Sequence, residues 1–346
     1  MADQDTFFRV DGLTKHYPVK RDVRRLAGKP KVVHALDDFT LELTPGRTVA
    51  VVGESGSGKS TVARLMARLE TPTAGRIVLA GKETQPRRRA AVRGYRREVQ
   101  LTLQDPYASL NPLRTVAYIL ERPLRIHGMA SGRAEIERRS IELLEQVHLT
   151  PAEQFLRKRP NELSGGQRQR VSIARALAVE PRILIADEPV SMLDVSVRLS
   201  VLNLFRELVV EKSLALVYIT HDIASARYFA DDIVVMYAGQ ILEAGPAEEV
   251  TQQPTHPYTQ LLLSAAPDPE ARRRGPRQRF AGTGEAPSLI DPPVGCRFRP
   301  RCPHAMESCL EQPPRRHVDP AHWAACWLLD PDEAEQSTQS PAPSAA

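Results

Sequence analysis

The glycine-rich segment at residues 53–60, Gly-Glu-Ser-Gly-Ser-Gly-Lys-Ser, constrains the fold of this chain more than any other feature. It follows the short apolar run 48–52 and precedes an apolar-periodic segment that predicts a helix through Leu69. A strand, a glycine loop and a helix in this order form a phosphate loop, in which backbone N–H groups and the helix N-terminus bind phosphate oxygens. The residues expected to bind the nucleotide here are Gly53, Ser55, Gly56, Gly58, Lys59, Ser60 and Thr61.

Acidic residues end a second apolar run, at 183–188. We expect Lys59 to reach the β- and γ-phosphates and the Ser60 hydroxyl to coordinate Mg²⁺. Asp187 ends the run and is expected to hold the same Mg²⁺ through water. Glu188 follows at the strand end, where a turn of the chain brings its carboxylate toward the γ-phosphate as a general base.

The segment 163–167, Leu-Ser-Gly-Gly-Gln, precedes a helix that is expected to continue through Leu177. Serine at position 164 is a good helix N-cap, and the two glycines after it permit close approach of the backbone to an anion. The order and spacing of these motifs resemble those of ATP-binding cassette (ABC) proteins. The resemblance implies that ATP is the nucleotide and Mg²⁺ its metal. It also implies that four residues meet the ATP held by a second cassette: Ser164, Gly165, Gly166 and Gln167.

Four single residues take their expected roles from the same resemblance. Gln104 matches the glutamine that binds Mg²⁺ and senses the membrane partner, and His221 matches the histidine that hydrogen-bonds the γ-phosphate. Tyr17 matches the aromatic residue that stacks on adenine. Asp194 matches the aspartate of the loop at the interface between cassettes. Glu188 and His221 are therefore the expected catalytic residues.

The expected fold class is α/β: a RecA-like core with an antiparallel β subdomain, an inserted helical subdomain and a small cysteine-containing extension. Buried parallel strands are expected near 182–186, 215–219 and 233–237. An amphipathic helix is expected after a cap at Ser131, with one apolar face formed by Ile136, Leu143, Leu144 and Val147. The expected boundaries are 1–265 for the ABC domain (helical subdomain about 105–180), 266–293 for a linker, 294–330 for the extension and 331–346 for a disordered tail.

Three local segments resemble the ATPases of oligopeptide and dipeptide importers. They are residues 104–112, 256–262 and 295–303. This resemblance implies an energy-coupling subunit that works with a second ATPase subunit, two membrane permease subunits and an extracytoplasmic substrate-binding protein. The same subfamily includes carriers of nickel and of oligosaccharides, so these solutes remain alternatives to peptides. We expect the segment 104–112 and the helical subdomain to dock a permease.

The chain has four cysteines, and all of them lie in the extension: Cys296, Cys302, Cys309 and Cys326. In a reducing cytosol, this clustering favours a metal over disulfides. Some members of the subfamily carry a [4Fe–4S] cluster here, which is the expected occupant. Two alternatives stay open: zinc, with His304 or His322 as a further ligand, and unmetallated thiols.

Charge and hydropathy narrow the function classes. The formal net charge is +5, which is compatible with nucleic acid or an anionic membrane face and proves neither. A soluble ABC ATPase acting on DNA or ribosomes is the rival, but there are no sustained heptads between the motifs and there is one cassette, so no nucleic-acid partner is expected. An ABC exporter is a third possibility, and it requires a membrane domain. No run of eighteen apolar residues exists, so we expect a peripheral protein on the cytoplasmic face of the membrane.

Overall fold

The computed structural model describes residues 7–19, 31–84, 89–105, 109–266 and 284–330. Its largest sheet has eight strands in the order β11-β12-β10-β9-β3-β8-β7-β6. The parallel part contains β3 (Thr48–Val52), β6 (Val99–Thr102), β7 (Ile183–Asp187), β8 (Ala215–Thr220) and β9 (Asp232–Tyr237). Strands β3, β7 and β8 are buried along their whole length, as in parallel sheets that are covered on both faces. The expected α/β fold is confirmed.

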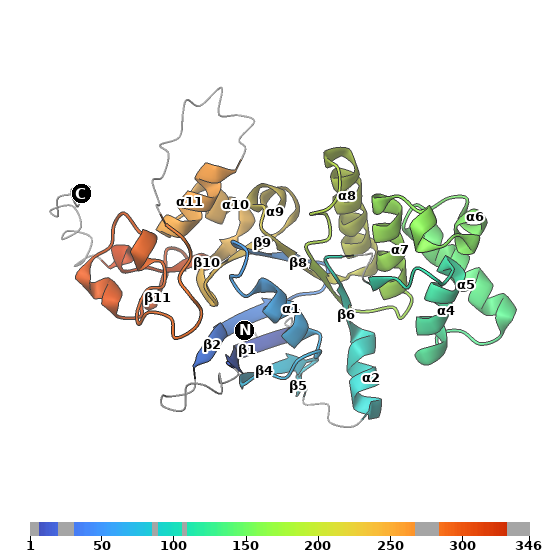
Figure 1. Ribbon diagram of the computed structural model, residues 1–346, viewed down its shortest axis with the longest axis horizontal. Helices are drawn as coiled ribbons and strands as arrows, with labels where there is room; N and C mark the ends of the chain where they lie inside the picture. The colour runs from blue at the N-terminus through green and yellow to red at the C-terminus, as the bar shows by residue number, and fades with distance from the viewer. Residues whose placement is uncertain (1–6, 20–30, 85–88, 106–108, 267–283, 331–346) are drawn as a thin grey trace, which may run out of the picture.

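Both faces of this sheet are packed because successive strand residues point in opposite directions. Val52 and Leu184 lie in one hydrophobic cluster, while their neighbours Val51 and Ile185 lie in the other. The face of Val51 is covered by α1 (Lys59–Met66) and by the antiparallel subdomain. The opposite face is covered by helices, as Figure 1 shows: α8 (Val195–Lys212), α9 (Ile223–Phe229), α10 (Ala247–Gln252) and α11 (Pro257–Ala265).

The antiparallel subdomain is a four-stranded sheet in the order β2-β1-β4-β5. Its strands are β1 (Phe8–Pro18), β2 (Val32–Leu43), β4 (Ala74–Leu79) and β5 (Lys82–Glu83). Helix α2 (Arg89–Glu98) then leads back to β6. Helix α1 ends at Met66 and not at Leu69 as expected, because Arg68 adopts a left-handed φ of 51°.

The inserted helices lie at the far end of the molecule from β1 and β2 (Figure 1). They are α4 (Val116–Ile126), α5 (Arg133–Gln146), α6 (Ala152–Arg157) and, after a 3₁₀ turn (Pro160–Glu162), α7 (Gly165–Leu177). The apolar face predicted for α5 is buried. The cap predicted at Ser131 was wrong by one residue, because Gly132 caps α5 and the Ser131 N–H donates to the Glu135 carboxylate at 2.7 Å.

The cysteine-containing extension continues the core sheet. Strand β12 (Trp323–Ala325) pairs antiparallel with β10 (Gln240–Pro246), and β11 (Arg315–His317) pairs with β12. Three 3₁₀ turns complete it, at Arg299–Arg301, Glu307–Leu310 and Trp327–Leu329. The end of the expected linker joins the antiparallel subdomain, since Ile290 bridges to Val33. The expected tail 331–346 lies outside the described residues. None of the described helices has the length and hydropathy needed to cross a membrane.

Candidate functional site

The glycine loop joins β3 to α1 and encloses a buried cation. A Cβ atom at Gly53 would lie 2.1 Å from the Met236 carbonyl oxygen, and Gly58 has a φ of 101°, so neither position accepts a larger residue without strain. The Lys59 ammonium donates to the carbonyl oxygens of Gly53 and Glu54 at 2.7 and 2.8 Å. Burial lowers the pKa of Lys59, while nearby carboxylates oppose that shift. The loop therefore holds its positive charge inside a backbone cradle suited to an anion.

Serine and aspartate lie side by side where β7 ends. The Ser60 hydroxyl is 3.3 Å from Asp187 Oδ1. Burial raises the pKa of Asp187, and the bond from Ser60 opposes this. A hydroxyl and a buried carboxylate at this separation are the oxygen ligands that Mg²⁺ takes in phosphate-loop enzymes. These two residues therefore fit the metal that was expected from the sequence.

The carboxylate of Glu188 is held between two side chains from neighbouring strand ends. Glu188 leaves the β geometry with a φ of 45°, which turns its side chain away from the direction that strand alternation would give it. Gln104, after β6, donates from Nε2 to Glu188 Oε2 at 3.0 Å. His221, after β8, places Nδ1 3.3 Å from Glu188 Oε1. The carboxyl ends of three parallel strands thus bring these predicted residues together.

Tyr17 lies at the end of β1 beside α1. Its hydroxyl donates to Glu70, and the Lys15 ammonium lies 4.9 Å from its ring centroid. Burial, together with the bond to Glu70, raises the pKa of Tyr17 to about 12. Thr61 in the first turn of α1 also interacts with this hydroxyl. The aromatic ring therefore lies beside the first turn of α1, the helix that follows the glycine loop.

The segment 163–167 forms the start of α7 through a reciprocal cap. Ser164 Oγ accepts from the Gln167 N–H at 3.3 Å, and Gln167 Oε1 accepts from the Ser164 N–H at 3.0 Å. Gly166 packs so tightly on α8 that a Cβ atom there would lie 2.4 Å from Val197 Cγ1. Figure 1 shows α7 apart from α1, and the two helices pack into different hydrophobic clusters on opposite faces of the core sheet. One chain does not bring this segment to its own glycine loop.

The loop before α8 is exposed. Asp194 precedes the helix and is exposed, and its carboxylate makes no capping bond to the helix backbone. Apolar side chains beside it also face solvent: Met192 is 63% exposed and Val195 72% exposed. Exposed apolar residues next to a predicted interface aspartate are typical of a surface that a partner covers.

The four cysteines converge on one small cavity of the extension. Its lining includes Cys296, Cys302, Cys309, Cys326, His256 and His304. Burial raises the pKa of the Cys302 and Cys326 thiols to about 12. Among the described residues, no three of these sulfur atoms lie within 4.8 Å of one another. Thiolates around one zinc ion lie closer, at about 3.8 Å for tetrahedral Zn–S bonds. The structure therefore shows converging thiols without a ready single-ion site.

His322, an expected alternative ligand, and His256, which lines this cavity, differ in their partners. His322 is bonded elsewhere, since its Nε2 lies 2.7 Å from a carboxylate oxygen of the buried Glu243. His256 Nδ1 accepts from the Tyr258 N–H at 3.0 Å. Its Nε2 is buried and has no hydrogen-bond partner among the described residues. A neutral His256 ring with Nδ1 as acceptor carries its proton on this unpartnered nitrogen.

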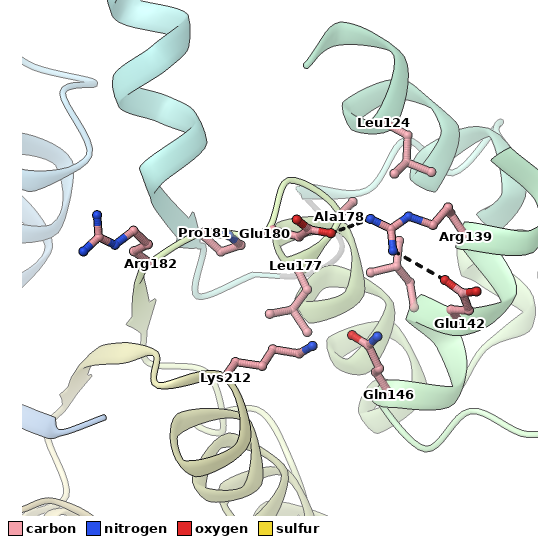
Figure 2. Close-up of a pocket in the computed structure, with 11 residues that line it drawn as sticks. Leu124, Arg139, Glu142, Gln146, Leu177, Ala178, Glu180, Pro181, Arg182 and Lys212 are labelled. Carbon is pink, nitrogen blue, oxygen red and sulfur yellow. Dashed lines mark hydrogen bonds and ion pairs between the residues drawn. The ribbon is translucent and has the colours of Figure 1, made fainter. Parts of the chain in front are cut away.

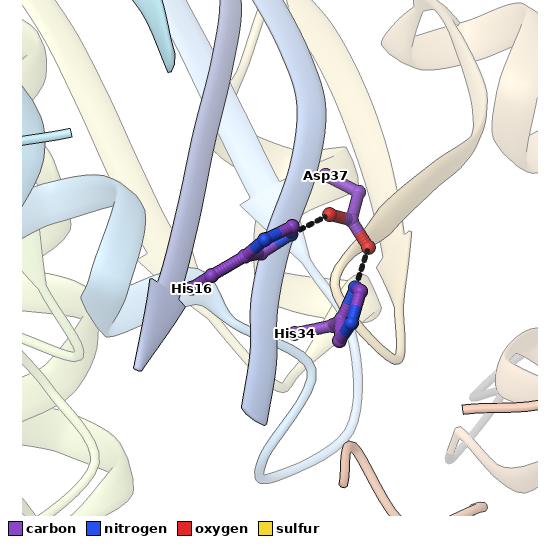
Figure 3. A group of neighbouring side chains, drawn as sticks. All are labelled: His16, His34 and Asp37. Carbon is purple, nitrogen blue, oxygen red and sulfur yellow. Dashed lines mark hydrogen bonds and ion pairs between the residues drawn. The ribbon is translucent and has the colours of Figure 1, made fainter. Parts of the chain in front are cut away.

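Two further features lie outside the predicted set. A cavity of about 320 Å³ lies between α5 and the turn after α7, where Arg139 joins Glu142 and Glu180, and no predicted nucleotide residue lines it (Figure 2). His16, His34 and Asp37 form a cluster on β1 and β2, in which both rings bond the carboxylate (Figure 3). The sequence reasoning also missed Arg301 and Tyr258, which contact the glycine loop, because no local motif links the extension to that loop.

Comparisons with known proteins agree with this geometry. The ABC transporter family model matches residues 36–191, and the model of the oligopeptide/dipeptide transporter C-terminal region matches residues 242–309. The dipeptide transport ATP-binding protein DppF of Haemophilus influenzae is 43% identical over 321 residues, covering 92% of this chain and 95% of that protein. The oligopeptide transport ATP-binding protein AppF of Bacillus subtilis is 41% identical over 330 residues, covering 94% and 98%.

Comparison with solved structures also identifies ABC cassettes as similar proteins. A dimeric post-hydrolysis structure of the ATP-binding cassette MJ0796, bound to ADP and Pi, matches with a TM-score of 0.61 and 30% identity. The match covers 69% of this chain and 98% of that one. The relatives are at least 41% identical to this chain over at least 92% of its length, and both family models match it. This chain therefore belongs to the ATP-binding subunits of ABC transporters, in the group that has the oligopeptide/dipeptide transporter C-terminal region.

Proposed function

We propose that this chain hydrolyses ATP to drive the import of dipeptides or oligopeptides, as a peripheral subunit on the cytoplasmic face of the membrane. The observation that carries the ATPase role is the double contact of Gln104 and His221 with the Glu188 carboxylate, beside the Ser60–Asp187 pair. Glu188 would take the proton of the attacking water, and His221 would bond the γ-phosphate. Bound Mg²⁺ would neutralise phosphate charge, with Ser60, Asp187 and Gln104 around it.

The proposed active site is shared between two cassettes. The exposed Ser164 and the start of α7 lie away from the glycine loop of their own chain. In a dimer, their N–H groups and helix dipole would bind the γ-phosphate held by Lys59 of the partner. Exposed apolar residues beside Asp194 supply a surface for that dimer. The partner is a second copy or a homologous subunit.

A groove in the helical subdomain is the proposed docking surface for a permease. Its volume is about 520 Å³, and it lies between residues 109–111 and helix α4. Tyr118 and Ile126 line it and are 37% and 45% exposed. Leu110 also lines the groove but is only 1% exposed, and Tyr107 lies outside the described residues. The groove begins a few residues after Gln104, so a permease bound there is near the residue that contacts Glu188.

The test is transport by the assembled complex. The chain is co-expressed with candidate permease subunits and a second ATPase subunit from the same genome, purified in detergent and reconstituted with a candidate substrate-binding protein. We expect ATP-dependent uptake of a labelled dipeptide or oligopeptide, and ATP hydrolysis stimulated by the peptide-loaded binding protein. Uptake of nickel or an oligosaccharide in place of peptides would overturn the choice of solute. Failure to bind any permease would overturn the import role.

We also propose that the four cysteines hold a [4Fe–4S] cluster that stabilises the extension. Support comes from their convergence on one cavity and from the unpartnered His256 Nε2, whose ring lines the same cavity. Four thiolates are the usual ligands of such clusters, and the N–H of His256 would bond a cluster or cysteine sulfur. Metal binding would add folding free energy to a small segment with little core of its own.

Anaerobic purification tests this second proposal. We expect brown protein with about four iron atoms per chain, and loss of colour in Cys302→Ser. Ser308→Ala, on a 3₁₀ turn of the same extension, is the matched control and is expected to stay brown. Stoichiometric zinc without iron would replace the cluster by the zinc alternative. Metal-free protein in which all four thiols react with a thiol reagent would overturn both the iron–sulfur proposal and the zinc alternative.

A further inference from the structure

The turn from Cys296 to Cys302, called the cysteine turn below, is fixed against the ATPase core. Backbone bonds close it, with the Arg299 N–H donating to the Cys296 carbonyl at 3.0 Å and the Arg301 N–H to Phe298 at 2.9 Å. The Phe298 ring is fully buried, with its centroid 5.4 Å from those of Tyr237 and Tyr258. The turn is therefore held in one position against the core, and this fixes the backbone from which its arginines extend.

The first of these arginines joins the turn to the antiparallel subdomain. Arg297 is 5% exposed and donates to the Ala238 carbonyl at 2.5 Å and to the Asp37 carboxylate. The same carboxylate receives His16 at 2.5 Å and His34 at 3.3 Å, as Figure 3 shows. All of the Asp37 oxygens are thus in use, so this cluster is an anchor for the turn.

The second arginine reaches the glycine loop itself. Arg301 donates from both terminal guanidinium nitrogens to Glu54, from Nη1 to Oε2 at 2.8 Å and from Nη2 to Oε1 at 3.1 Å. Glu54 lies between Gly53 and Ser55 of the phosphate-binding segment. Its backbone N–H is also taken, since it donates to the Tyr258 hydroxyl at 2.9 Å. The extension therefore holds both the backbone and the side chain of this loop residue.

The charge of Glu54 is unfavourable for the task of the loop. ATP brings several negative charges to this loop, and a carboxylate in the same loop repels them. Glu54 is close enough to Lys59 to contribute to the pKa of that ammonium. The Arg301 side chain is 10% exposed and pairs with Glu54 in the two-pronged geometry that gives strong, oriented ion pairs. Without the arginine, the Glu54 carboxylate would lose its ion-pair partner and would repel the phosphates of bound ATP.

We propose that Arg301 is a positioning residue for ATP binding: it neutralises Glu54 inside the phosphate loop, so the cysteine extension sets the affinity of the site for ATP. The inference rests on the ATP-binding part of the proposed function, and it depends on neither peptide import nor an iron–sulfur cluster. It assigns to the extension a direct role in the nucleotide site of its own chain.

A double-mutant cycle on the full-length protein tests the proposal. Titration calorimetry measures the Kd for ATP, ADP and AMP in wild type, Arg301→Gln, Glu54→Gln and the double variant. We expect Arg301→Gln to raise the Kd for ATP about tenfold, with a smaller effect for ADP and least for AMP, because repulsion grows with phosphate charge. Glu54→Gln should bind ATP at least as well as wild type, and the double variant should match Glu54→Gln. The defect of Arg301→Gln should shrink at high salt.

Controls separate this role from folding and from the ATPase assignment. Arg299→Gln, an exposed arginine on the same turn, removes the same charge and should leave all Kd values unchanged. Arg301→Lys should retain most of the affinity. Unchanged ATP binding in Arg301→Gln would overturn the proposal, as would a double variant as weak as Arg301→Gln. Loss of binding in Lys59→Ala shows that the assay reports the phosphate loop, and normal binding in that variant would instead count against the ATP site.

Discussion

Gln104 donates a hydrogen bond to one oxygen of Glu188 at 3.0 Å, while His221 lies 3.3 Å from the other oxygen. The carboxylate is therefore oriented by two residues that follow different strands of the same parallel sheet. Gln104 also precedes the segment that leads to the proposed docking groove. A shift of that segment would change the contact with Glu188, the proposed general base, and this is the route that we propose between permease and hydrolysis.

Glu188→Gln tests the general base. Replacing the carboxylate by an amide removes the proton acceptor but keeps a side chain of the same size, so we expect turnover to fall by about 10²–10⁴ while ATP binding survives. Phosphate release and ATP affinity are measured on the assembled complex. Glu211→Gln, on the exposed end of α8, serves as the control. Near-normal hydrolysis in Glu188→Gln would remove Glu188 from its proposed role.

Gly166→Ala tests the close packing of α7 on α8. The added Cβ would lie 2.4 Å from Val197 Cγ1, so the start of α7 must move, at a cost of about 1–3 kcal/mol in the free energy of unfolding. We expect ATP binding to the isolated subunit to persist and hydrolysis by the dimer to drop. Gly94→Ala is the matched control, because nothing lies within 4 Å of its added Cβ. Full dimer activity in Gly166→Ala would argue against a site shared between cassettes.

Tyr118→Ala tests the docking groove. Removing this half-exposed ring takes away apolar contact area on the surface proposed to meet the permease. Peptide uptake by reconstituted complexes should fall, while basal hydrolysis by the cassette dimer without permeases stays unchanged. Tyr228→Ala, an exposed tyrosine on α9, should leave uptake intact. If both variants transport equally well, the permease binds elsewhere.

Asp37→Asn tests the anchor between β2 and the cysteine turn. Burial raises the pKa of Asp37, but the bonds from His16 and Arg297 outweigh it, so the net pKa is lowered. The stabilisation is therefore present above the unfolded-state pKa of about 3.9 and is lost as pH falls through the folded-state value. Chemical unfolding should show the variant less stable by about 1–3 kcal/mol near neutral pH. The gap to wild type should narrow below about pH 4, and a gap that widens there would contradict the assignment.

The local sequence was sufficient to predict structure wherever a short continuous segment determines its own backbone conformation. The phosphate loop was predictable because glycine positions, a lysine and a serine form one continuous strand–loop–helix unit. The buried strands that end at Asp187 and before His221 were predictable because their apolar runs are continuous. Helix boundaries were less predictable. The end of α1 depends on the left-handed backbone at Arg68, which the local sequence does not require.

The sequence by itself determined the ABC-type α/β core and the grouping of four cysteines in one segment, and it predicted the set of nucleotide-binding residues. Only the tertiary structure decided that Gln104 and His221 share the Glu188 carboxylate, because parallel strands distant in sequence end at one edge. It alone placed Arg301 on Glu54, a pair separated by 247 residues, since β12 adds to the core sheet and carries the extension back to the phosphate loop. Contacts of this kind depend on sheet order and strand register, and a local pattern in the chain specifies neither.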